Sequence, residues 1–582
     1  MSNSLFRKKN ISSILAEGGN EEHGGHSLKR VLTLKDLTFF GIAAILGAGS
    51  FSSLGFAVFH GGPGVVVLFV ITAIACGFTA LCYSEFASRI PVAGSAYTYA
   101  YASFGELFAW IIGWALIMEY SIGNIYVAYS WSDYFTSLMG KLNVHIPEYL
   151  STSYMEAKHA VEKGSSNAEE LAAWSNAPVI GSLKIILDLP ALIINFLITY
   201  LVYRGIKESR NFSNVMVILK LAVVALIIIV GGYLVFSNGL TYNWSPEDDA
   251  GVKSFMPNGF GGVMLAVSSV FFAYIGFDAV SVLAEESKNP QKDLPRGMIL
   301  SLVICTVIYI LLTLVLTGAV NYRKFEGVGD PLAFIFEPQN LNIGWMQFVV
   351  AIIAVVAMTS VLLVFQMGQP RMWMTMSRDG LMPPVFQKIH PKFKTPSFAT
   401  IITGLVVGIP ILFTDKTFVL DFTSIATLFA FVLVCGGVLL IPRKEKIGGR
   451  FHLPYINGQY IFPLVIAAAI ITAYMLSNSY FKNIFNFDFS ANEDYLADKK
   501  SFMDLATPNI SLIIFWISAI LLAGFAFIKK YSLIPLMGVI TCMYLLTGMS
   551  KSNWVWFIGW LALGMIFYFM YGYRKSKLAG KD

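Results

Sequence analysis

The chain has 582 residues, of which 56% are hydrophobic and only 13% are charged, and its mean hydropathy is +0.66. This composition excludes a water-soluble globular protein of this size and predicts a polytopic membrane protein. The formal net charge of +6 indicates attraction to the anionic lipids of an inner leaflet. We therefore expect membrane lipid, and not nucleic acid, as the large partner of this chain.

Apolar runs of about 20 residues, long enough for a helix to cross the hydrocarbon core, recur from residue 36 onward. We predict about fourteen spans, at 36–58, 64–88, 105–138, 183–203, 212–236, 260–283, 297–319, 345–370, 397–414, 420–441, 460–478, 510–528, 531–549 and 552–573. The first 35 residues are polar and lack the apolar core of a cleaved signal peptide. Residues 1–35 are therefore predicted to form a cytoplasmic tail.

The basic residues test this topology independently. The predicted cytoplasmic segments hold 28 of the 41 Lys and Arg residues, the opposite side holds 11, and Lys184 and Lys220 lie within spans. Such an excess on one side follows the positive-inside rule and favours an even number of crossings. We predict a multi-pass protein of the plasma (inner) membrane with both termini in the cytoplasm.

Three long loops are predicted on the outer side. Residues 139–182 include an amphipathic, helix-like stretch, residues 237–259 connect two spans, and residues 479–509 are acidic. Such loops form caps or lids in some proteins and are solvated connections in others, and both interpretations stay open.

Residues that carry chemistry are sparse. All five cysteines lie within predicted spans without metal-ligand spacing, and the seven histidines avoid the span interiors. We therefore expect no disulfide, no metal and no bound cofactor. The sequence shows no nucleophile with a neighbouring base and no cluster of acids and histidines, so we do not expect an enzyme.

Two predicted spans are interrupted at their middle. The first contains "ILGAGSFSSLG", with Gly47, Ala48 and Gly49, and the sixth contains "FFAYIGFDAV", with Gly276 and Asp278. These are the first spans of two sets of five, and an odd number per set makes the sets opposite in orientation. Interruptions at matching positions of inverted repeats indicate the binding site of a transporter.

The interruptions suggest a ligand class. Peptide groups freed inside a membrane must find new partners, and the N–H groups at the start of a half-helix can hold a carboxylate. Freed carbonyls on the other half-helix can hold an ammonium group. An α-amino acid carries both groups on one carbon, so we expect it as the ligand. Close packing of two helices through small residues is the alternative.

Long motifs carry a family resemblance. They include "DLTFFGIAAILGAGSF", "FFAYIGFDAVSVLAEESKNPQKDLPRG", "GQPRMWMTMSRDGLMP" and "WFIGWLALGMIFYFMYGYRKS". Together they resemble the cationic amino acid transporter branch of the amino acid–polyamine–organocation superfamily, over about residues 33–441 and 531–576. The resemblance implies an all-α fold with a LeuT-like core of five plus five inverted spans over 36–441, four additional transmembrane helices over 442–576, and a cytoplasmic tail over 577–582.

The resemblance also implies a substrate site. It combines residues of the two interrupted spans with an acid of span 3: Ile45, Gly47, Ala48, Gly49, Ser50, Glu119, Phe272, Ala273, Tyr274, Ile275 and Gly276. Two positions differ from the family pattern. Ser50 replaces the isoleucine of "GAGIF", and Ala115 replaces the acid of "GWDLxLEY". The second difference weakens an inference of cationic substrates from the family alone.

Four of the ionisable residues within predicted spans carry specific expectations. Lys220 is expected to change its protonation state, because desolvation favours the neutral amine, and the resemblance implies a role in proton coupling. The alternative is that Lys220 extends to the inner interface. Glu119 either faces the substrate or bonds another helix. Glu85 and Asp278 are expected to have structural roles.

These observations predict a secondary active transporter that takes up L-amino acids by alternating access, driven by the proton gradient. An exchanger, or a uniporter of cationic amino acids, is the alternative within this class. A membrane sensor of amino acids or a channel is the alternative from another class.

Overall fold

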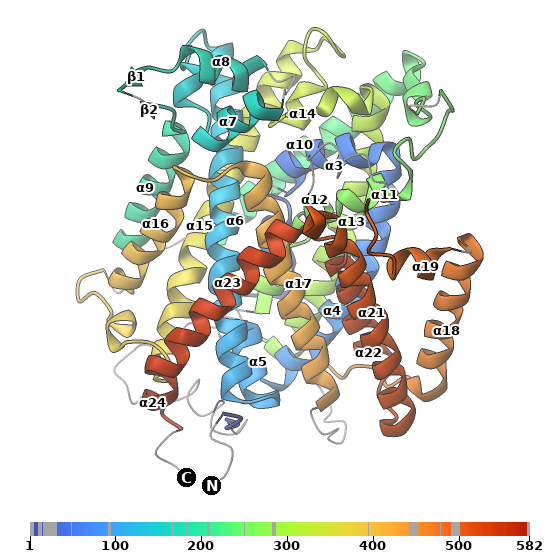
Figure 1. The fold of residues 1–582 in the computed structure, drawn as a ribbon. Coiled ribbons are helices and arrows are strands. Elements are labelled where there is room, and N and C mark those ends of the chain that lie inside the picture. The colour runs from blue at the N-terminus through green and yellow to red at the C-terminus, as the bar shows by residue number, and fades with distance from the viewer. Residues whose placement is uncertain are drawn as a thin grey trace.

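The computed structural model of the chain is a bundle of helices (Figure 1). It describes residues 5–9, 14, 32–47, 49–90, 95–163, 168–181, 183–205, 210–248, 251–281, 287–393, 395–440, 451–477, 479–490 and 501–578. Ala48, one of the predicted site residues, lies outside the described residues. Within them, the only strands are β1 (Val179–Ile180) and β2 (Leu183–Lys184), which form one antiparallel hairpin.

The helices follow one another along the whole chain. Up to residue 272 they are α2 (Leu34–Ile45), the π-helix η2 (Gly49–Ser53), α3 (Leu54–Gly61), α4 (Val65–Arg89), α5 (Ser95–Ser103), α6 (Glu106–Lys141), α7 (Tyr154–Lys163), α8 (Ala168–Asn176), α9 (Leu189–Arg204), α10 (Arg210–Ser237), α11 (Gly259–Leu265) and α12 (Val267–Phe272). The remainder are α13 (Pro290–Ala319), α14 (Pro331–Phe334), α15 (Gly344–Arg378), α16 (Ser397–Ile411), α17 (Lys416–Leu440), α18 (Gly458–Leu476), α19 (Tyr480–Ile484), α21 (Phe502–Lys529), α22 (Leu533–Leu546), α23 (Lys551–Phe567), the π-helix η9 (Tyr568–Gly572) and α24 (Tyr573–Lys575). Short 3-10 turns lie between them at Gly62–Gly64, Glu148–Leu150, Leu240–Trp244, Tyr322–Phe325 and Pro384–Gln387.

Helices lie in all fourteen predicted spans. Among the described residues, nine helical segments are long and apolar enough to cross a membrane, and three shorter apolar helices are α9, α16 and α22. One of the nine, Gly49–Arg89, includes parts of the first two predicted spans. The sixth predicted span contains no long helix because it is broken into α11 and α12. The chain is therefore an all-α, polytopic membrane protein.

The fourth span begins later than predicted. Residues 183–184 pair with residues 179–180 in the hairpin, and α9 starts at Leu189. Its start is capped by Asp188, whose carboxylate accepts a hydrogen bond from the Ala191 amide at 3.0 Å, and Pro190 lies in the first turn, where proline is favoured. The hairpin and this cap fix the start of the helix at Leu189, although apolar residues precede it.

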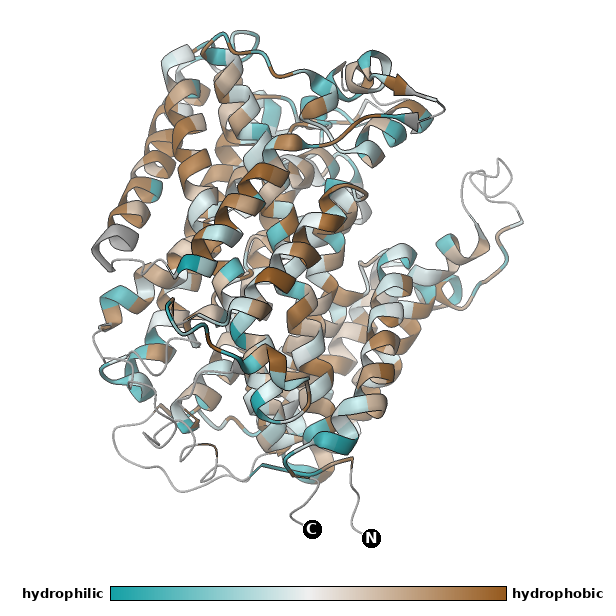
Figure 2. Ribbon diagram, turned by 90° about the vertical axis from the view of Figure 1, so that its left-hand side faces the viewer, coloured by the Kyte–Doolittle hydropathy of each residue, from teal (hydrophilic) through white to brown (hydrophobic). Residues whose placement is uncertain are grey.

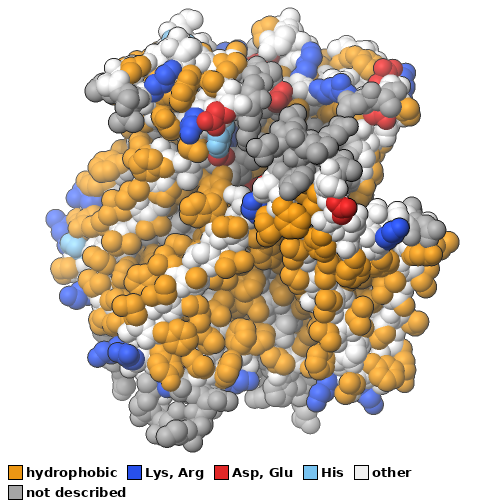
Figure 3. Space-filling view, in the orientation of Figure 1, with side chains coloured by type: hydrophobic (Ala, Val, Ile, Leu, Met, Phe, Trp, Pro, Cys, Tyr) orange, Lys and Arg blue, Asp and Glu red, His pale blue; other side chains and the backbone are white. Residues whose placement is uncertain are grey.

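The surface has the pattern of a protein in a bilayer. The ribbon is coloured mainly as hydrophobic residues in the middle of the bundle, and hydrophilic residues are more frequent toward its two ends (Figure 2). In the space-filling view an apolar band crosses the visible face, and lysine and arginine side chains lie along its lower edge (Figure 3). Exposed Leu, Ile, Val and Phe side chains on this band contact lipid when the protein is in its membrane.

Burial distinguishes central from peripheral helices. In the most apolar window of α6, 89% of the residues are buried, compared with 17% in α18 and 22% in α21. Helix α6 packs against α15 and α17, while α13 packs against α2 and α4. The core therefore lies around α6, and α18 and α21 lie at the periphery of the bundle (Figure 1).

Both chain ends lie on one side of the bundle (Figure 1). We call this the terminal side, and it carries residues 5–9 and 573–578. The opposite side, which we call the distal side, carries α7, α8 and α14. The long predicted loop at 139–182 thus contains two short helices, and we call α7 and α8 the lid helices.

Candidate functional site

The first span is broken where the sequence predicts. Helix α2 ends at Ile45, and the next helical residues form the π-helix η2, which starts at Gly49. Between them, the Gly47 carbonyl accepts hydrogen bonds from the amides of Ser50 and Phe51 at 3.1 and 3.2 Å. The Ser50 hydroxyl donates to the same carbonyl at 2.9 Å. Ser50 therefore stabilises the start of the second half-helix.

The sixth span is broken at the matching place. Helix α12 ends at Phe272, and residues 273–277 are a turn. Gly276 has a φ of +114°, a conformation that side-chain-bearing residues rarely adopt, and a Cβ atom there would lie 3.0 Å from the Ala44 carbonyl carbon. This glycine permits both the turn and the contact with the first span.

The two broken spans run antiparallel and face each other at their breaks. A Cβ atom on Gly41 would lie 3.0 Å from Val280 Cγ2, and one on Gly49 only 2.5 Å from Ala273 Cα. The Ser53 hydroxyl donates to the Ser269 carbonyl at 3.1 Å. Residues later in the first span thus contact residues earlier in the sixth span. This is the arrangement that paired interruptions in two inverted repeats predict.

Tyr309 of α13 connects the two breaks. Its hydroxyl lies 2.8 Å from the Ile45 carbonyl oxygen and 2.6 Å from the Ala273 carbonyl oxygen. A tyrosine hydroxyl has one hydrogen, so it donates to one of these carbonyls at a time. The Ile45 carbonyl also accepts a hydrogen bond from the Gly47 amide at 2.9 Å, so the hydroxyl is not its only donor. Tyr309 is not among the predicted site residues, although a tyrosine inside the apolar run "VICTVIYILLTLVL" is a detectable signal.

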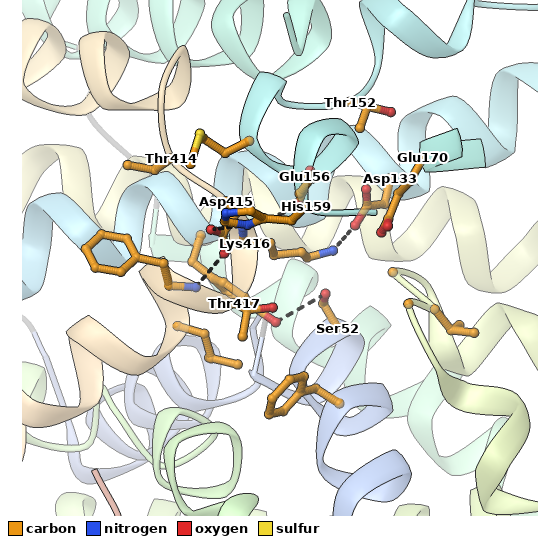
Figure 4. A pocket seen from close by; sticks show the side chains of 18 of the residues that line it. Ser52, Asp133, Thr152, Glu156, His159, Glu170, Thr414, Asp415, Lys416 and Thr417 are labelled. Carbon is orange, nitrogen blue, oxygen red and sulfur yellow. Dashed lines mark hydrogen bonds and ion pairs between the residues drawn. The ribbon is translucent and has the colours of Figure 1, made fainter. Parts of the chain in front are cut away.

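A cavity of about 1590 Å³ opens on the distal side. It is larger than the roughly 300–1,000 Å³ of a small-molecule pocket, so it is a vestibule. The lid helices and the start of α17 contribute its upper wall, where Glu156, His159, Asp415 and Lys416 lie close together (Figure 4). The cavity reaches down into the bundle as far as Ser52, Met118, Ser121, Ile122 and Tyr126.

Aromatic residues form the floor of this cavity. The rings of Tyr126 on α6 and Phe272 on α12 meet at a centroid distance of 4.7 Å, and the Tyr126 hydroxyl lies 3.4 Å from Ser52 Oγ. In the described part of the chain, the predicted substrate-binding residues do not line the cavity. They are buried at or beneath its floor: Ile45, Gly47, Gly49, Ser50, Glu119, Phe272, Ala273, Tyr274, Ile275 and Gly276.

Tyr274 binds a different neighbour from the rest of the break. Its hydroxyl donates to the Phe69 carbonyl of α4 at 3.0 Å. Its ring packs against Tyr309 with centroids 5.5 Å apart. Tyr274 therefore anchors the broken sixth span on the second span.

Glu119 is buried on α6 with only 5% of its surface exposed. Its Oε2 atom has no hydrogen-bond partner, and Glu119 forms no ion pair with the described residues. It interacts with Thr427 of α17 and is repelled by the buried carboxylate of Asp278. Glu119 therefore points toward α17 and the sixth span, with one oxygen atom uncompensated.

Lys220 lies inside the bundle and not at an interface. Its side chain is on α10 with 1% exposed, and Nζ lies 3.4 Å from the Ala43 carbonyl oxygen. Ala43 is in the last turn of α2, whose carboxyl end carries partial negative charge. The ammonium group therefore caps the half-helix just before the first break. Lys220 therefore contacts the first broken span, and its side chain is buried in this conformation. Its role in proton coupling stays a prediction.

The terminal side of the bundle is closed around Glu106. This fully buried carboxylate accepts hydrogen bonds from Tyr101 at 3.1 Å, Tyr568 at 3.0 Å and Ser576 at 2.5 Å. Arg7 lies 3.9 Å away. One carboxylate at the start of α6 thus connects the amino-terminal segment, α5 and the carboxyl-terminal helices.

Asp379 forms a second connection on the same side. Its carboxylate pairs with Lys9 at 2.9 Å and accepts a hydrogen bond from Tyr97 at 2.7 Å, while its carbonyl accepts one from the Lys577 amide at 3.1 Å. The charged "SRDGLMP" loop therefore contributes to closing this side. The conformation is open on the distal side and closed on the terminal side.

Comparison with known proteins identifies the family. The family model for amino acid permeases matches residues 32–493. The chain belongs to this amino acid permease family. The permease is 42% identical over 445 residues to the branched-chain amino acid permease BcaP of Bacillus subtilis, covering 76% of this chain and 87% of that protein.

Two further relatives extend the comparison. The permease is 39% identical over 480 residues to the methylthioribose transporter of Bacillus subtilis, covering 81% of this chain and 93% of the relative. It is 29% identical over 636 residues to the vacuolar cationic amino acid transporter 2 of Arabidopsis thaliana, covering 99% and 93%. The cationic amino acid transporter resemblance is therefore confirmed. The permease moves a small molecule through the membrane.

Two carboxyl groups in the distal cavity have perturbed acidity. Burial and the neighbouring Glu337 raise the pKa of Asp330 to about 7. Burial, Glu170 and Asp415 raise the pKa of Glu156 to about 8. Both groups line the vestibule, so its charge changes across the neutral pH range.

Proposed function

We propose that this permease takes up L-amino acids across the plasma membrane by alternating access, together with a proton. The observation that carries the proposal is the pair of antiparallel broken spans joined by Tyr309, located between an open vestibule and a closed terminal side. The excess of basic residues in the segments on the terminal side supports a cytoplasmic location for that side.

The proposed substrate site uses the residues of both breaks. The ammonium group of the amino acid replaces part of the hydrogen bonding of Tyr309 at the carbonyls of Ile45 and Ala273. Its carboxylate faces the Gly49 amide at the start of η2. Phe272, Tyr274, Ile275 and Gly276 surround the side chain. Glu119, with its uncompensated oxygen, adds negative charge near the ammonium group.

Lys220 is the proposed proton carrier. In the present conformation its ammonium group is stabilised by the carboxyl end of α2 through the Ala43 carbonyl. If α2 moves when the terminal side opens, this partner is lost, and burial then favours the neutral amine. Release of the proton would thus accompany release of the amino acid.

The test is uptake into proteoliposomes of labelled leucine, alanine, arginine and methylthioribose, with and without an imposed pH gradient. We expect saturable uptake of at least one amino acid that increases when the outside is acidic. In the Lys220→Met variant we expect gradient-driven uptake to be lost while equilibrium binding remains. Uptake by this variant that still follows the gradient would refute the role of Lys220. Gradient-insensitive counterflow in the unmodified permease would favour an exchanger.

A second candidate substrate comes from the comparison. The similarity to the methylthioribose transporter extends over most of both chains, and that relative is named for a ligand without an amino acid's ammonium and carboxylate. Uptake of methylthioribose with no uptake of amino acids would replace the proposed substrate class. It would leave the transport path unchanged.

A further inference from the structure

Basic and aromatic side chains meet where helix α9 ends. Arg204 is the last residue of α9, and its guanidinium carbon lies 5.2 Å from the centre of the Phe393 ring and 5.7 Å from the centre of the Tyr200 ring. Lys392 Nζ lies 5.6 Å from the centre of the same Phe393 ring. Cations within about 6 Å of an aromatic ring are attracted to its face. These contacts hold two positive charges around one ring.

His390 adds a hydrogen-bond donor beside these cations. Its ring stacks on Phe393 with centroids 4.7 Å apart, and its Nδ1 atom accepts hydrogen bonds from the amides of Lys392 and Phe393 at 3.2 Å. Because Nδ1 is an acceptor, the neutral ring carries its hydrogen on Nε2. Among the described residues, Nε2 has no hydrogen-bond partner. We call Arg204, His390, Lys392 and Phe393 the basic cluster.

The cations of the basic cluster are open to an anion from outside the chain. Within the described ranges, neither Arg204 nor Lys392 forms an ion pair with a carboxylate, whereas Lys9 on the terminal side pairs with Asp379. The side chains of Arg204 and Lys392 are both exposed. A negatively charged group can therefore reach them without displacing an acid of the described chain.

The backbone around the basic cluster also favours a negative group. The carboxyl end of α9 carries partial negative charge, but the Tyr203 carbonyl there accepts a hydrogen bond from Thr395 Oγ1 at 2.8 Å. This bond places the start of α16, at Ser397, beside the end of α9. The amino end of α16 carries partial positive charge. Charge from the backbone thus adds to that of Arg204 and Lys392.

An apolar surface adjoins the basic cluster. Helices α9 and α16 pack against each other, and Asn195 Nδ2 donates to the Gly404 carbonyl at 3.1 Å. Residues three and four apart lie on one face of a helix. Exposed apolar residues with this spacing are Ile193, Phe196 and Tyr200 of α9 and Phe398, Ile401 and Leu405 of α16. Arg204 continues the α9 series, and α9 runs from the distal side toward the terminal side (Figure 1), so the basic cluster lies at the terminal end of this surface.

We propose that the basic cluster binds the phosphate of an anionic phospholipid in the leaflet on the terminal side. The phosphate oxygens accept hydrogen bonds from the Arg204 guanidinium and from His390 Nε2, and Lys392 supplies the second positive charge. The acyl chains lie on the exposed surface of α9 and α16. A lipid fits better than free phosphate, because it alone uses both the cations and the apolar surface that ends at them. The bound lipid connects α9 to the segment before α16.

The test is a titration of the full permease in detergent with phosphatidylglycerol or phosphatidylcholine, measured by native mass spectrometry. We expect tighter binding of phosphatidylglycerol, which carries the net negative charge. Arg204→Gln should weaken this binding about tenfold, the loss expected for a hydrogen bond to a charged group, and Lys392→Gln should weaken it as well. The matched control is Lys529→Gln, which removes one exposed positive charge at the end of α21 and should bind phosphatidylglycerol as the unmodified permease does.

Thermal unfolding keeps the result independent of folding. Each variant should unfold cooperatively, and phosphatidylglycerol should raise the melting temperature of the unmodified permease and of Lys529→Gln more than that of Arg204→Gln. Equal affinity for the two lipids, or an equal loss of affinity in Lys529→Gln and Arg204→Gln, would overturn the site. Inorganic phosphate that displaces phosphatidylglycerol and raises the melting temperature equally would overturn the assignment to a lipid, because it would show that the cluster binds a free anion.

Discussion

At the scale of single residues, Tyr309 is the group on which the geometry of the two breaks depends. Its hydroxyl is shared by the carbonyls of Ile45 and Ala273, which belong to different broken spans. Inside a membrane no water replaces a missing donor. The hydroxyl therefore compensates the breaks in the absence of substrate and leaves one carbonyl available to an ammonium group.

We expect Tyr309→Phe to reduce uptake and to lower the melting temperature. The variant leaves both buried carbonyls without this donor, at a cost of about 1–3 kcal/mol. Because an ammonium group can replace the lost donor, a saturating substrate should restore much of the melting temperature. The measurements are thermal unfolding in detergent, with and without substrate, and initial uptake rates.

Tyr274→Phe is the matched control. It removes a hydroxyl from a neighbouring ring, and that hydroxyl bonds the Phe69 carbonyl of α4 and the Thr306 side chain of α13. The Tyr274→Phe variant should have a lower melting temperature, and a saturating substrate should not restore it. Equal rescue of both variants would contradict the assignment of Tyr309 to the substrate site.

At the scale of elements, the lid helices are attached to the start of α17 by a few polar contacts. Glu156 of α7 accepts a hydrogen bond from the Lys416 amide at 3.1 Å, and His159 lies 3.4 Å from Asp415. Lys416 in turn pairs with Asp133 of α6. Since α17 also carries Thr427, which interacts with Glu119, these contacts link the lid to the proposed substrate site.

The lid contacts should depend on pH through Glu156. Burial, Glu170, Asp415 and Asp188 raise the pKa of Glu156 from 4.5 to about 8 in the folded protein. The folded state thus favours the neutral form. The contribution of neutral Glu156 to the stability of the folded state is fully present below pH 4.5 and is lost as the pH rises through 8. Hydrogen exchange in α7 and α8, corrected for intrinsic rates, should therefore accelerate between pH 6 and pH 9.

Glu156→Gln should remove most of this pH dependence, because glutamine has the size of the neutral side chain and does not titrate. The exposed Glu162, in the same helix and paired with Lys158 at 3.7 Å, provides the control. Glu162→Gln should retain the pH dependence. A pH profile that is the same in Glu156→Gln as in the unmodified permease would assign the effect to another group.

At the scale of the whole molecule, the permease is open on one side and closed on the other. The closure combines the amino-terminal segment, α5, the start of α6, the end of α15 and the carboxyl-terminal helices around Glu106 and Asp379. Alternating access requires these contacts to break when the terminal side opens. They therefore contribute to the free-energy difference between the two conformations.

Asp379→Asn should shift the permease toward opening of the terminal side. It removes the charge that pairs with Lys9 and an acceptor for Tyr97, bonds of a kind worth about 1.5–3 kcal/mol. We expect faster hydrogen exchange in residues 95–107 and a higher KM for uptake from the distal side. Glu162→Gln removes one charge on the distal surface and should change neither. Unchanged exchange in residues 95–107 would show that Asp379 does not hold this side closed.

Much of the fold follows from local sequence. All fourteen predicted spans contain helix, because runs of about 20 apolar residues leave few alternatives in a bilayer. The positions of both breaks were also predictable, since glycine at mid-span is unusual and Gly276 adopts a φ that glycine favours. The start of α9 was misplaced because the hairpin and the Asp188 cap depend on local pairing.

The candidate site was only partly predictable. Lys220 contacts the first span, and its role in coupling stays a prediction. Tyr309, Glu106 and Asp379 are not among the predicted site residues. The partners of these residues are far away in the chain, as with Tyr309 and Ile45, which are 264 residues apart, or Glu106 and Ser576, which are 470 apart.

The sequence by itself determined the class of protein, the positions of the spans and the two breaks, because hydrophobic length and glycine act on their own neighbours in the chain. Only the tertiary structure decided that the breaks share one tyrosine hydroxyl, that the predicted binding residues are buried at or beneath an aromatic floor, and that Arg204 lies on the Phe393 ring. These features depend on packing between helices from distant parts of the chain, which no local pattern records.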